Sequence, residues 1–216
     1  MNFEREPQMI CEFVDGNVGL HAYLVIDSTR DGRSCGGLRI LEDLTLKEVK
    51  ALARAMTLKY SFLKRNMGGA KAGIVLPERC TPVQRTQILE AFGRELSPIL
   101  KNKIYTPWTD MNCSIEDIAT IMKAAGCAFK GMSDSAYFTA LTVASAVKAA
   151  CDIQGIDLST ASVAIEGFGN VGSNVGQELS KWGTKIVGVS TTKGAIYDIR
   201  RFGYQEISRA KKEIWG

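Results

Sequence analysis

The pattern that most constrains the fold is a glycine-rich turn between an apolar stretch and a helical pattern. Residues 161–190 read ASVAIEGFGNVGSNVGQELSKWGTKIVGVS, which predicts a strand, a turn, a helix and a second strand. Gly167, Gly169 and Gly172 form G-x-G-x-x-G where the first strand gives way to the helix. Such glycines let the backbone approach a pyrophosphate at the helix N-terminus, so the turn predicts dinucleotide binding. The alternative is a tight structural turn without a ligand.

Strand and helix patterns alternate along the rest of the chain, which is typical of an α/β fold. Expected strands are GLHAYLVIDS (19–28) and CGGLRIL (35–41), joined by a polar turn, then AGIVLP (72–77) and KIYTPW (103–108). Expected helices are 81–100, with Thr81 as cap and Pro82 first, 114–126, capped by Ser114, and 139–153. We place the domain boundary near residues 130–138, which gives domains 1–135 and 136–216.

A further helix is predicted after Thr45, because Thr45 and Glu48 have the spacing of a capping box. An apolar stripe at intervals of three and four residues follows, and it predicts the face that packs on the core. The stripe consists of Val49, Leu52, Met56, Lys59 and Leu63. Lys59 therefore occupies a core-facing position, unless its long side chain extends to the surface.

A second lysine, Lys71, lies among small residues in NMGGAKAGIVLP, on a loop that enters a strand. Burying an ammonium group is costly unless it is paired, so two such lysines predict a shared anionic ligand. A desolvated lysine beside another cation can act as a base near neutral pH. Asp110 follows the strand 103–108, at the end where open α/β sheets place ligand residues. The alternative for Asp110 is a helix-capping or turn residue.

Composition excludes several classes of protein. The net charge of +4 is mild, and the basic cluster near the C-terminus (Arg200, Arg201, Arg209, Lys211 and Lys212) is better explained by a solvated helix face than by nucleic acid. The N-terminus does not resemble a signal peptide, and no stretch approaches the ~20 apolar residues of a membrane span. Six separated cysteines without C-x-x-C pairs predict reduced thiols in the cytoplasm. A single histidine argues against a metal site and against Ser-His-Asp catalysis.

Together these segments resemble the glutamate/leucine/phenylalanine/valine dehydrogenase family. The resemblance runs in order through GGLRI (36–40), ARAMTLKYS (53–61), NMGGAKAGI (66–74), YTPWTDM (105–111), VAIEGFGNVGS (163–173) and VGVSTTKGAIYD (187–198). It implies an N-terminal substrate-binding and oligomerisation domain, followed by the start of a Rossmann domain that binds NAD or NADP. The implied reaction is reversible oxidative deamination of an L-amino acid to a 2-oxo acid and ammonia, in a homo-oligomer.

The resemblance also implies a role for each site residue. Lys59 would bind the substrate α-carboxylate, Lys71 would activate the attacking water, and Asp110 would carry protons to and from the amine. The other implied residues are Cys35, Gly36 and Gly37 beside the substrate, Thr139 at the nicotinamide amide, and Gly167, Phe168, Gly169, Asn170, Val171, Gly172, Ser190 and Thr191 around the rest of the dinucleotide.

The chain departs from the family pattern at several positions. Cys35 stands where glutamate-specific members carry a lysine for the side-chain carboxylate, which favours an apolar substrate, whereas VSTTKGAIYD resembles the glutamate branch. Ala140 and Thr142 replace glycines, and Thr191 replaces the acid that holds a ribose hydroxyl. The chain ends after two expected strands of the Rossmann domain, so we expect a truncated domain or one completed by another chain. The alternative function is a non-catalytic relative that serves as an oligomerising or amino-acid-sensing module.

Overall fold

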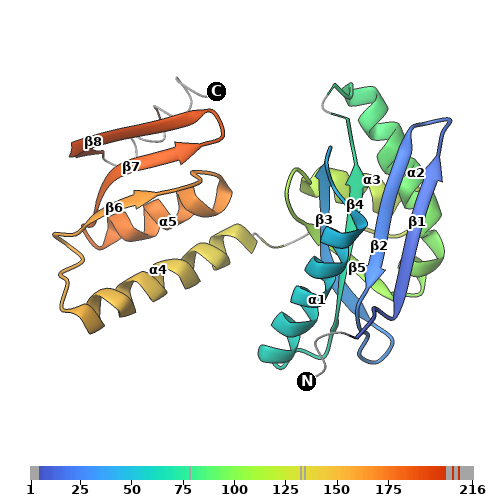
Figure 1. Cartoon of the computed structure of the whole chain (residues 1–216), viewed down its shortest axis with the longest axis horizontal. Helices are drawn as coiled ribbons and strands as arrows, with labels where there is room; N and C mark the ends of the chain where they lie inside the picture. The colour runs from blue at the N-terminus through green and yellow to red at the C-terminus, as the bar shows by residue number, and fades with distance from the viewer. Residues whose placement is uncertain are drawn as a thin grey trace. The chain divides into compact units, whose positions relative to one another are not determined.

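A computed structural model of the chain describes residues 5–77, 79–131, 133, 135–202, 206 and 209. The chain divides into two compact units, residues 1–132 and 133–216, each with its own sheet (Figure 1). Of the C-terminal basic cluster, all side chains except that of Arg209 lie outside the described residues. The mixture of strands and helices agrees with the predicted α/β class.

The first unit is built on a five-stranded sheet with the strand order β1-β2-β4-β3-β5. Strands β3, β4 and β5 are parallel, whereas β1 and β2 run antiparallel to their neighbours. The bounds are Met9–Asp15 for β1, Leu20–Ile26 for β2, Ser34–Leu41 for β3, Gly68–Val75 for β4 and Tyr105–Thr109 for β5. Strand β4 is central, and its residues from Gly68 to Ile74 are all buried.

Three details of this sheet differ from the expectations. Strand β1 was not expected at all. The two strands joined by the polar turn are confirmed as β2 and β3, but they do not pair with each other, because β4 lies between them. Strand β4 begins at Gly68, so Lys71 lies inside a strand and not on a loop. Glycine and alanine gave the loop prediction because they are weak strand formers, and here burial between two neighbouring strands overrides that preference.

Helices cover both faces of this sheet (Figure 1). Helix α1 (Leu46–Phe62) packs on one face, whereas α2 (Pro82–Lys101) and α3 (Ile115–Ala124) enclose the main core on the other. Successive residues of a strand point to opposite faces. Ala70, Ala72 and Ile74 accordingly belong to the α2 and α3 core, while Lys71, between them, faces α1.

The predicted helix caps are confirmed for α2 and α3, and half confirmed for α1. Thr81 and Ser114 each form a reciprocal capping box with the third residue of their helix. Thr45 accepts a hydrogen bond from the Glu48 amide, but the Glu48 carboxylate does not return one, because it binds Arg39. Only one half of the predicted capping box therefore forms, and the Glu48 carboxylate makes an ion pair in place of the other half.

The apolar stripe of α1 was expected to face the core, and only its first part does. Val49 is buried, as is Ala53, but Leu63 is 52% exposed and Lys59 is also exposed. The helix turns Thr57 and Tyr60 toward the sheet instead, where their polar groups find partners. The expectation that Lys59 lies on a core-facing stripe is wrong, because polar contacts and not apolar spacing fix the rotation of the C-terminal half.

The second unit contains a sheet with the order β6-β7-β8, in which β6 and β7 are parallel and β8 is antiparallel to β7. The elements are α4 (Ser135–Gln154), β6 (Ser162–Ile165), α5 (Asn170–Lys181), β7 (Lys185–Thr191) and β8 (Gly194–Phe202). Only two strands were expected here. The third, β8, follows a turn at Thr192 and Lys193 that composition alone did not identify as a hairpin.

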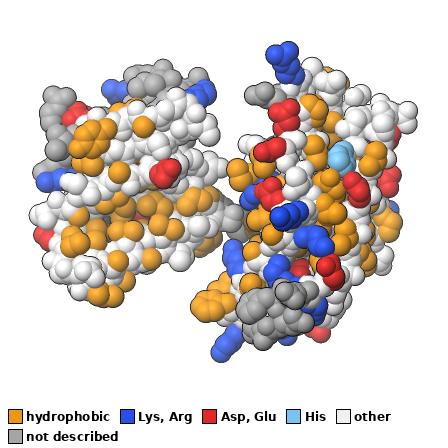
Figure 2. Space-filling view, in the orientation of Figure 1, with side chains coloured by type: hydrophobic (Ala, Val, Ile, Leu, Met, Phe, Trp, Pro, Cys, Tyr) orange, Lys and Arg blue, Asp and Glu red, His pale blue; other side chains and the backbone are white. Residues whose placement is uncertain are grey.

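Helix α4 is long and apolar enough to cross a membrane, by length and composition only. Its apolar window has a mean hydropathy of 1.2, and 11% of that window is buried. Hydrophobic side chains are visible on this part of the second unit in Figure 2. The expectation that no stretch approaches such a length is therefore wrong. Length and composition by themselves do not assign a membrane, since core helices can have both.

We predict that Gly69→Ala destabilises the first unit. A Cβ at residue 69 would lie 2.1 Å from the backbone nitrogen of Thr57, so α1 would have to move away from β4. Overpacking of this kind costs about 1–3 kcal/mol of unfolding free energy. Urea denaturation followed by circular dichroism measures it. Gly16→Ala is the matched control, because nothing lies within 4 Å of its added Cβ. Equal stability of the two variants would contradict the close packing of α1 on β4.

Candidate functional site

Lys71 and Asp110 form an ion pair on the α1 face of the first sheet. Lys71 Nζ lies 2.5 Å from Asp110 Oδ2, and the Lys71 side chain is only 7% exposed. Asp110 directly follows β5, as predicted, and β3 separates that strand from β4. The lysine on β4 must therefore reach across β3 to meet the aspartate. The structure thus brings together two residues that are distant in sequence.

Gly37 on β3 makes this reach possible. A Cβ at residue 37 would lie 2.8 Å from the Asp110 Cβ and 3.4 Å from Lys71 Nζ. Any side chain here would occupy the space through which Lys71 meets Asp110. Gly36 serves packing instead, because its Cβ would overlap the carbonyl oxygen of Ala70 on the neighbouring strand. The two glycines predicted to lie beside a substrate therefore have different physical roles.

Arg39 is the second cation at Asp110. Its Nε lies 3.0 Å from Asp110 Oδ2, while its Nη1 lies 2.6 Å from Glu48 Oε1 on α1. Burial tends to raise the pKa of Asp110, but the hydrogen bonds from Lys71 and Arg39 outweigh it and hold that pKa below its usual value. Asp110 is therefore an ionised carboxylate at neutral pH, fixed in orientation by two cations.

The two cations leave one oxygen of Asp110 open. Both Lys71 and Arg39 bind Oδ2. Oδ1 makes no hydrogen bond with any residue in the described part of the chain, and the Asp110 side chain is 24% exposed. An ionised carboxylate with a free oxygen can accept a proton from, or a hydrogen bond donated by, a bound amine. The arrangement therefore presents one proton acceptor beside a buried ammonium group.

Cys35 lies on the same face of β3 as Gly37 and Arg39. Burial raises the pKa of its thiol, opposed by a hydrogen bond with Tyr60 and by the charge of Lys59. Burial and the bond to Cys35 likewise raise the pKa of Tyr60. Both groups are thus neutral at neutral pH. This position therefore offers a small uncharged group, with the exposed Lys59 as the cation nearby.

Sequence reasoning missed Arg39, Glu48 and Tyr60. Arg39 could have been found, because Cys35, Gly37 and Arg39 alternate along one strand and must share a face. Glu48 was assigned to helix capping, and its true partner is set by the approach of α1 to β3. Tyr60 carried no local signal. The sequence did single out Lys59, which is exposed and forms no ion pair in the described part of the chain.

The glycine turn of the second unit has the geometry of a phosphate-binding turn. Gly167 has a φ of 84°, which favours glycine, and Gly169 is the N-cap of α5 with nothing within 4 Å of an added Cβ. A Cβ at Gly172 would lie 2.2 Å from the Gly167 carbonyl oxygen. The three glycines thus supply the turn, the open approach and the close packing that a dinucleotide needs.

Ser190 braces this turn from β7. Its hydroxyl accepts a hydrogen bond from the Gly167 amide at 3.2 Å, and its carbonyl accepts one from the Phe168 amide at 2.6 Å. The Phe168 side chain is fully buried beside Ile186 and Val189, so only its backbone borders the turn. The amides of Asn170 and Val171, in the first turn of α5, are the donors that a pyrophosphate would meet.

Two further residues of the predicted dinucleotide site, Thr191 and Thr139, carry hydroxyl groups. The Thr191 hydroxyl accepts a hydrogen bond from the Lys193 amide, where a ribose would lie. Thr139, on α4, donates to the carbonyl oxygen of Ser135 at 2.7 Å. The residues present therefore fit a nicotinamide dinucleotide at the turn. The absence of an acid at residue 191 leaves both NAD and NADP compatible with the ribose end.

Two protein-family descriptions together match almost the whole chain. The family described as Glu/Leu/Phe/Val dehydrogenase, dimerisation domain, matches residues 8–126. The family described as Glutamate/Leucine/Phenylalanine/Valine dehydrogenase matches residues 131–215. This chain belongs to the Glu/Leu/Phe/Val dehydrogenase family. The resemblance inferred from the sequence is confirmed.

The glutamate dehydrogenase of Thermotoga maritima is 31% identical over 92% of this chain and 52% of its own length. NAD-specific glutamate dehydrogenase A of Halobacterium salinarum is 28% identical over 80% of this chain and 43% of its own length. NADP-specific glutamate dehydrogenase A1 of the same organism is 30% identical over 76% of this chain and 43% of its own length. The hetero-hexameric glutamate dehydrogenase of Thermus thermophilus superposes with a TM-score of 0.81 at 23% identity, covering 97% of this chain and 56% of that one. The chain thus spans about half the length of these relatives, which include both NAD- and NADP-specific enzymes.

We predict that Arg39→Met raises the pKa of Asp110, because it removes one of the two cations that keep the carboxylate ionised. Because the pKa of Asp110 is lower in the folded than in the unfolded protein, its ionisation stabilises the fold at pH values above the unfolded-state pKa. This stabilisation is lost as the pH falls through the folded-state pKa. Removing Arg39 should therefore weaken the pH dependence of folding stability that Asp110 causes. Carbon-13 NMR of the aspartate carboxyls measures the titration.

Arg85→Met is the matched control, because Arg85 binds Asp117 at 2.8 Å and should alter the pKa of Asp117 alone. An unchanged Asp110 titration in Arg39→Met would show that Lys71 alone holds the carboxylate ionised.

Proposed function

We propose that this chain carries the substrate site and the start of the cofactor domain of an NAD(P)-dependent amino-acid dehydrogenase. The reaction is the reversible conversion of an L-amino acid, water and oxidised cofactor to a 2-oxo acid, ammonium, reduced cofactor and a proton. The observation that supports it most directly is the Lys71–Asp110 pair with the free Oδ1 of Asp110. Family membership supplies the reaction class.

In this proposal Lys59 binds the substrate α-carboxylate. It is exposed and forms no ion pair among the described residues, so its ammonium group can meet an anion at a small desolvation cost. Lys59 belongs to α1, the helix on the face of the sheet that carries Lys71, and its charge acts on Cys35. The exposure of Lys59, which contradicts the apolar-stripe prediction, is thus compatible with its predicted role.

Asp110 and Lys71 carry out the proton transfers of the reaction. Asp110 Oδ1 accepts a proton from the substrate ammonium, which leaves the amine lone pair free to form the imine. A bound nicotinamide supplies the acceptor for the hydride that leaves Cα. The Lys71 ammonium group releases a proton to solvent, and its free amine then takes the proton of the water that attacks the imine carbon. Gly37 leaves the space that this approach requires. Asp110 returns its proton to the departing amine.

Substrate choice turns on Cys35. A neutral thiol in this position cannot pair with a second carboxylate, which favours an amino acid with an apolar side chain. The curated relatives, however, are named for glutamate, and the segment 187–198 resembles the glutamate branch. The proposal therefore covers an L-amino acid of either class, and the Cys35 substitution described below separates them.

We further propose a homo-oligomer in the cytoplasm. The matched dimerisation domain supports self-association. Free thiols at all six cysteines support a reducing compartment. A purely non-catalytic role as an oligomerising or sensing module has no need of the buried Lys71 or of its carboxylate partner, and burial of that ammonium group is costly.

We predict that Lys71→Ala abolishes turnover, because the water would lose its base. The assay follows cofactor reduction at 340 nm over a panel of L-amino acids, using the whole protein with each of NAD and NADP. Lys47→Ala, on the exposed face of α1, is the matched control and should keep full activity. Unchanged turnover in Lys71→Ala, with a folded protein by circular dichroism, would disprove the catalytic assignment.

We predict that Cys35→Lys shifts the preference toward glutamate, because it adds a cation where a side-chain carboxylate would bind. The ratio of kcat/KM for glutamate to that for leucine should rise about tenfold or more, the range expected for one buried charge-assisted pair. Cys35→Met replaces the thiol without adding charge and should not raise that ratio. If glutamate turnover does not increase in Cys35→Lys, residue 35 does not select the substrate.

A further inference from the structure

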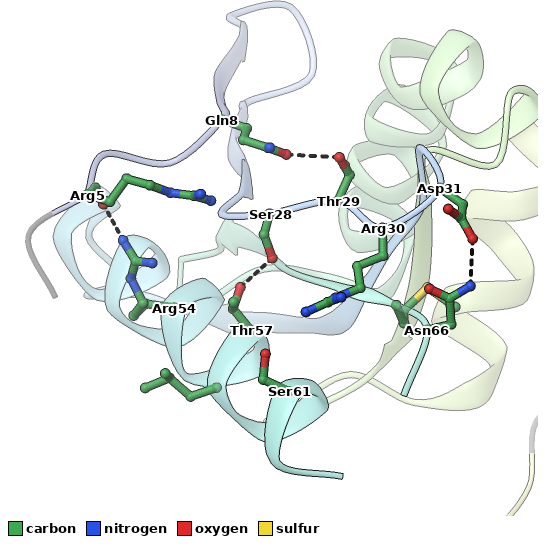
Figure 3. A pocket seen from close by; sticks show the side chains of 12 residues that line it. Arg5, Gln8, Ser28, Thr29, Arg30, Asp31, Arg54, Thr57, Ser61 and Asn66 are labelled. Atoms are coloured by element: carbon green, nitrogen blue, oxygen red, sulfur yellow. Dashed lines mark hydrogen bonds between the residues drawn. The ribbon is translucent and has the colours of Figure 1, made fainter. Parts of the chain in front are cut away.

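A second concave site lies on the first unit, away from Lys71 and Asp110. It is a pocket of about 620 Å³ between the turn that follows β2 and α1 (Figure 3). Neither Lys59, Lys71 nor Asp110 lines it. Its volume falls within the range of about 300–1,000 Å³ that is typical of small-molecule sites. The proposed dehydrogenase reaction makes no use of this pocket.

The pocket contains more positive than negative charge. Arg5, Arg30 and Arg54 line it, and Asp31 is the acidic residue in the lining. The Asp31 carboxylate accepts a hydrogen bond from the Asn66 amide at 2.6 Å and lies at the far wall from Arg5 (Figure 3).

Arg54 is already engaged within the protein. Its Nη1 lies 3.3 Å from Oδ2 of Asp27, a carboxylate that is only 1% exposed, and its Nη2 donates to the carbonyl oxygen of Arg5. Thr57 donates a hydrogen bond to the same Asp27 oxygen at 2.5 Å. The charge of Arg54 is therefore balanced beneath the pocket, and its guanidinium serves to hold the backbone of Arg5 in place.

Arg5 and Arg30 retain free donors. Arg5 uses one amino group to bind the carbonyl oxygen of Asp27 at 3.0 Å. The Arg30 side chain makes no hydrogen bond or ion pair with any residue that the structure describes. In Figure 3 the two side chains extend from opposite walls toward the middle of the pocket. The Ser61 hydroxyl, also without a partner among the described residues, lies below them.

The walls around these donors are held by hydrogen bonds. Gln8 accepts from Thr29 at 3.0 Å, and the hydroxyls of Ser28 and Thr57 lie 2.8 Å apart. Ser28 in turn accepts from the Gly69 amide, which connects the wall to β4. A pocket whose lining is fixed in this way loses little conformational entropy when it binds a ligand.

We propose that this pocket binds a small organic phosphate. Two guanidinium groups that face each other suit a tetrahedral dianion, whose oxygens can accept from both sides at once. A carboxylate has two coplanar oxygens and satisfies one guanidinium in the bidentate manner. Ser61 would donate to a third phosphate oxygen. Leu58 and Met67, also in the lining, offer an apolar wall for the organic part of the ligand.

The test is calorimetric titration of the 216-residue chain, in a buffer free of phosphate and at low salt, with phenyl phosphate, inorganic phosphate and benzoate as probes. We expect saturable binding of phenyl phosphate, weaker binding of inorganic phosphate, and no saturation by benzoate. Arg30→Ala should raise the Kd for phenyl phosphate about tenfold or more, as expected for one charge-assisted bidentate contact. Arg33→Ala, an exposed arginine of the same turn outside the lining, is the matched control and should leave the Kd unchanged.

Several results would overturn the proposal. They are the absence of saturable phenyl phosphate binding, an equal loss of affinity in Arg33→Ala, or benzoate binding as tightly as phenyl phosphate. Inorganic phosphate binding as tightly as phenyl phosphate would assign a free-ion site and remove the organic ligand. Light scattering on the same samples covers the remaining outcome. A change of subunit count in Arg30→Ala, without phosphate binding to the unaltered chain, would assign the pocket to a contact between protomers.

Discussion

The ion pair between Lys71 and Asp110 is the interaction on which the rest of the first unit depends. A buried ammonium group needs a partner, and here the partner comes from a strand two positions away in the sheet. Gly37 on the strand between them must be bare for the two groups to meet. Arg39 then binds the same carboxylate oxygen and connects it through Glu48 to α1. One charged group therefore determines which residues of β3 can carry a side chain and how the helix is fastened to the sheet.

Two clusters of polar side chains lie between the sheet and α1, and they contact different parts of the helix. Toward the start of α1, Glu48 belongs to the Asp110 cluster. Farther along, Arg54 and Thr57 satisfy Asp27 and form the floor of the arginine-lined pocket. In both clusters a carboxylate fixes the position of at least one cation. In the first, the carboxylate keeps an oxygen free for chemistry, whereas in the second the free donors belong to the arginines.

Local signals in the sequence predicted much of this structure. The caps at Thr81 and Ser114, the strand before Asp110 and the strand-turn-helix around Gly167 all follow from short-range rules, and each is confirmed. The errors have a common cause. The strand β4 through Gly68 and Ala70, the rotation of α1 and the insertion of β4 between β2 and β3 depend on contacts between distant segments. Propensity and periodicity carry no information on such contacts, so Lys71 was placed on a loop and Lys59 on the core-facing stripe.

The sequence by itself determined the family and the α/β class, because short motifs carry the signals for both. It also singled out Lys71 and Asp110, whose side chains form an ion pair in the structure. Only the tertiary structure decided that Arg39 shares the carboxylate, that Oδ1 of Asp110 is the open oxygen and that Cys35 is held neutral beside Tyr60. The arginine-lined pocket is also a feature that only the tertiary structure decided, since Arg5, Arg30 and Ser61 are far apart in the chain. The physical reason is that ion pairs and pockets form where side chains from distant segments come into contact. The packing of α1 on the sheet decides which side chains do so.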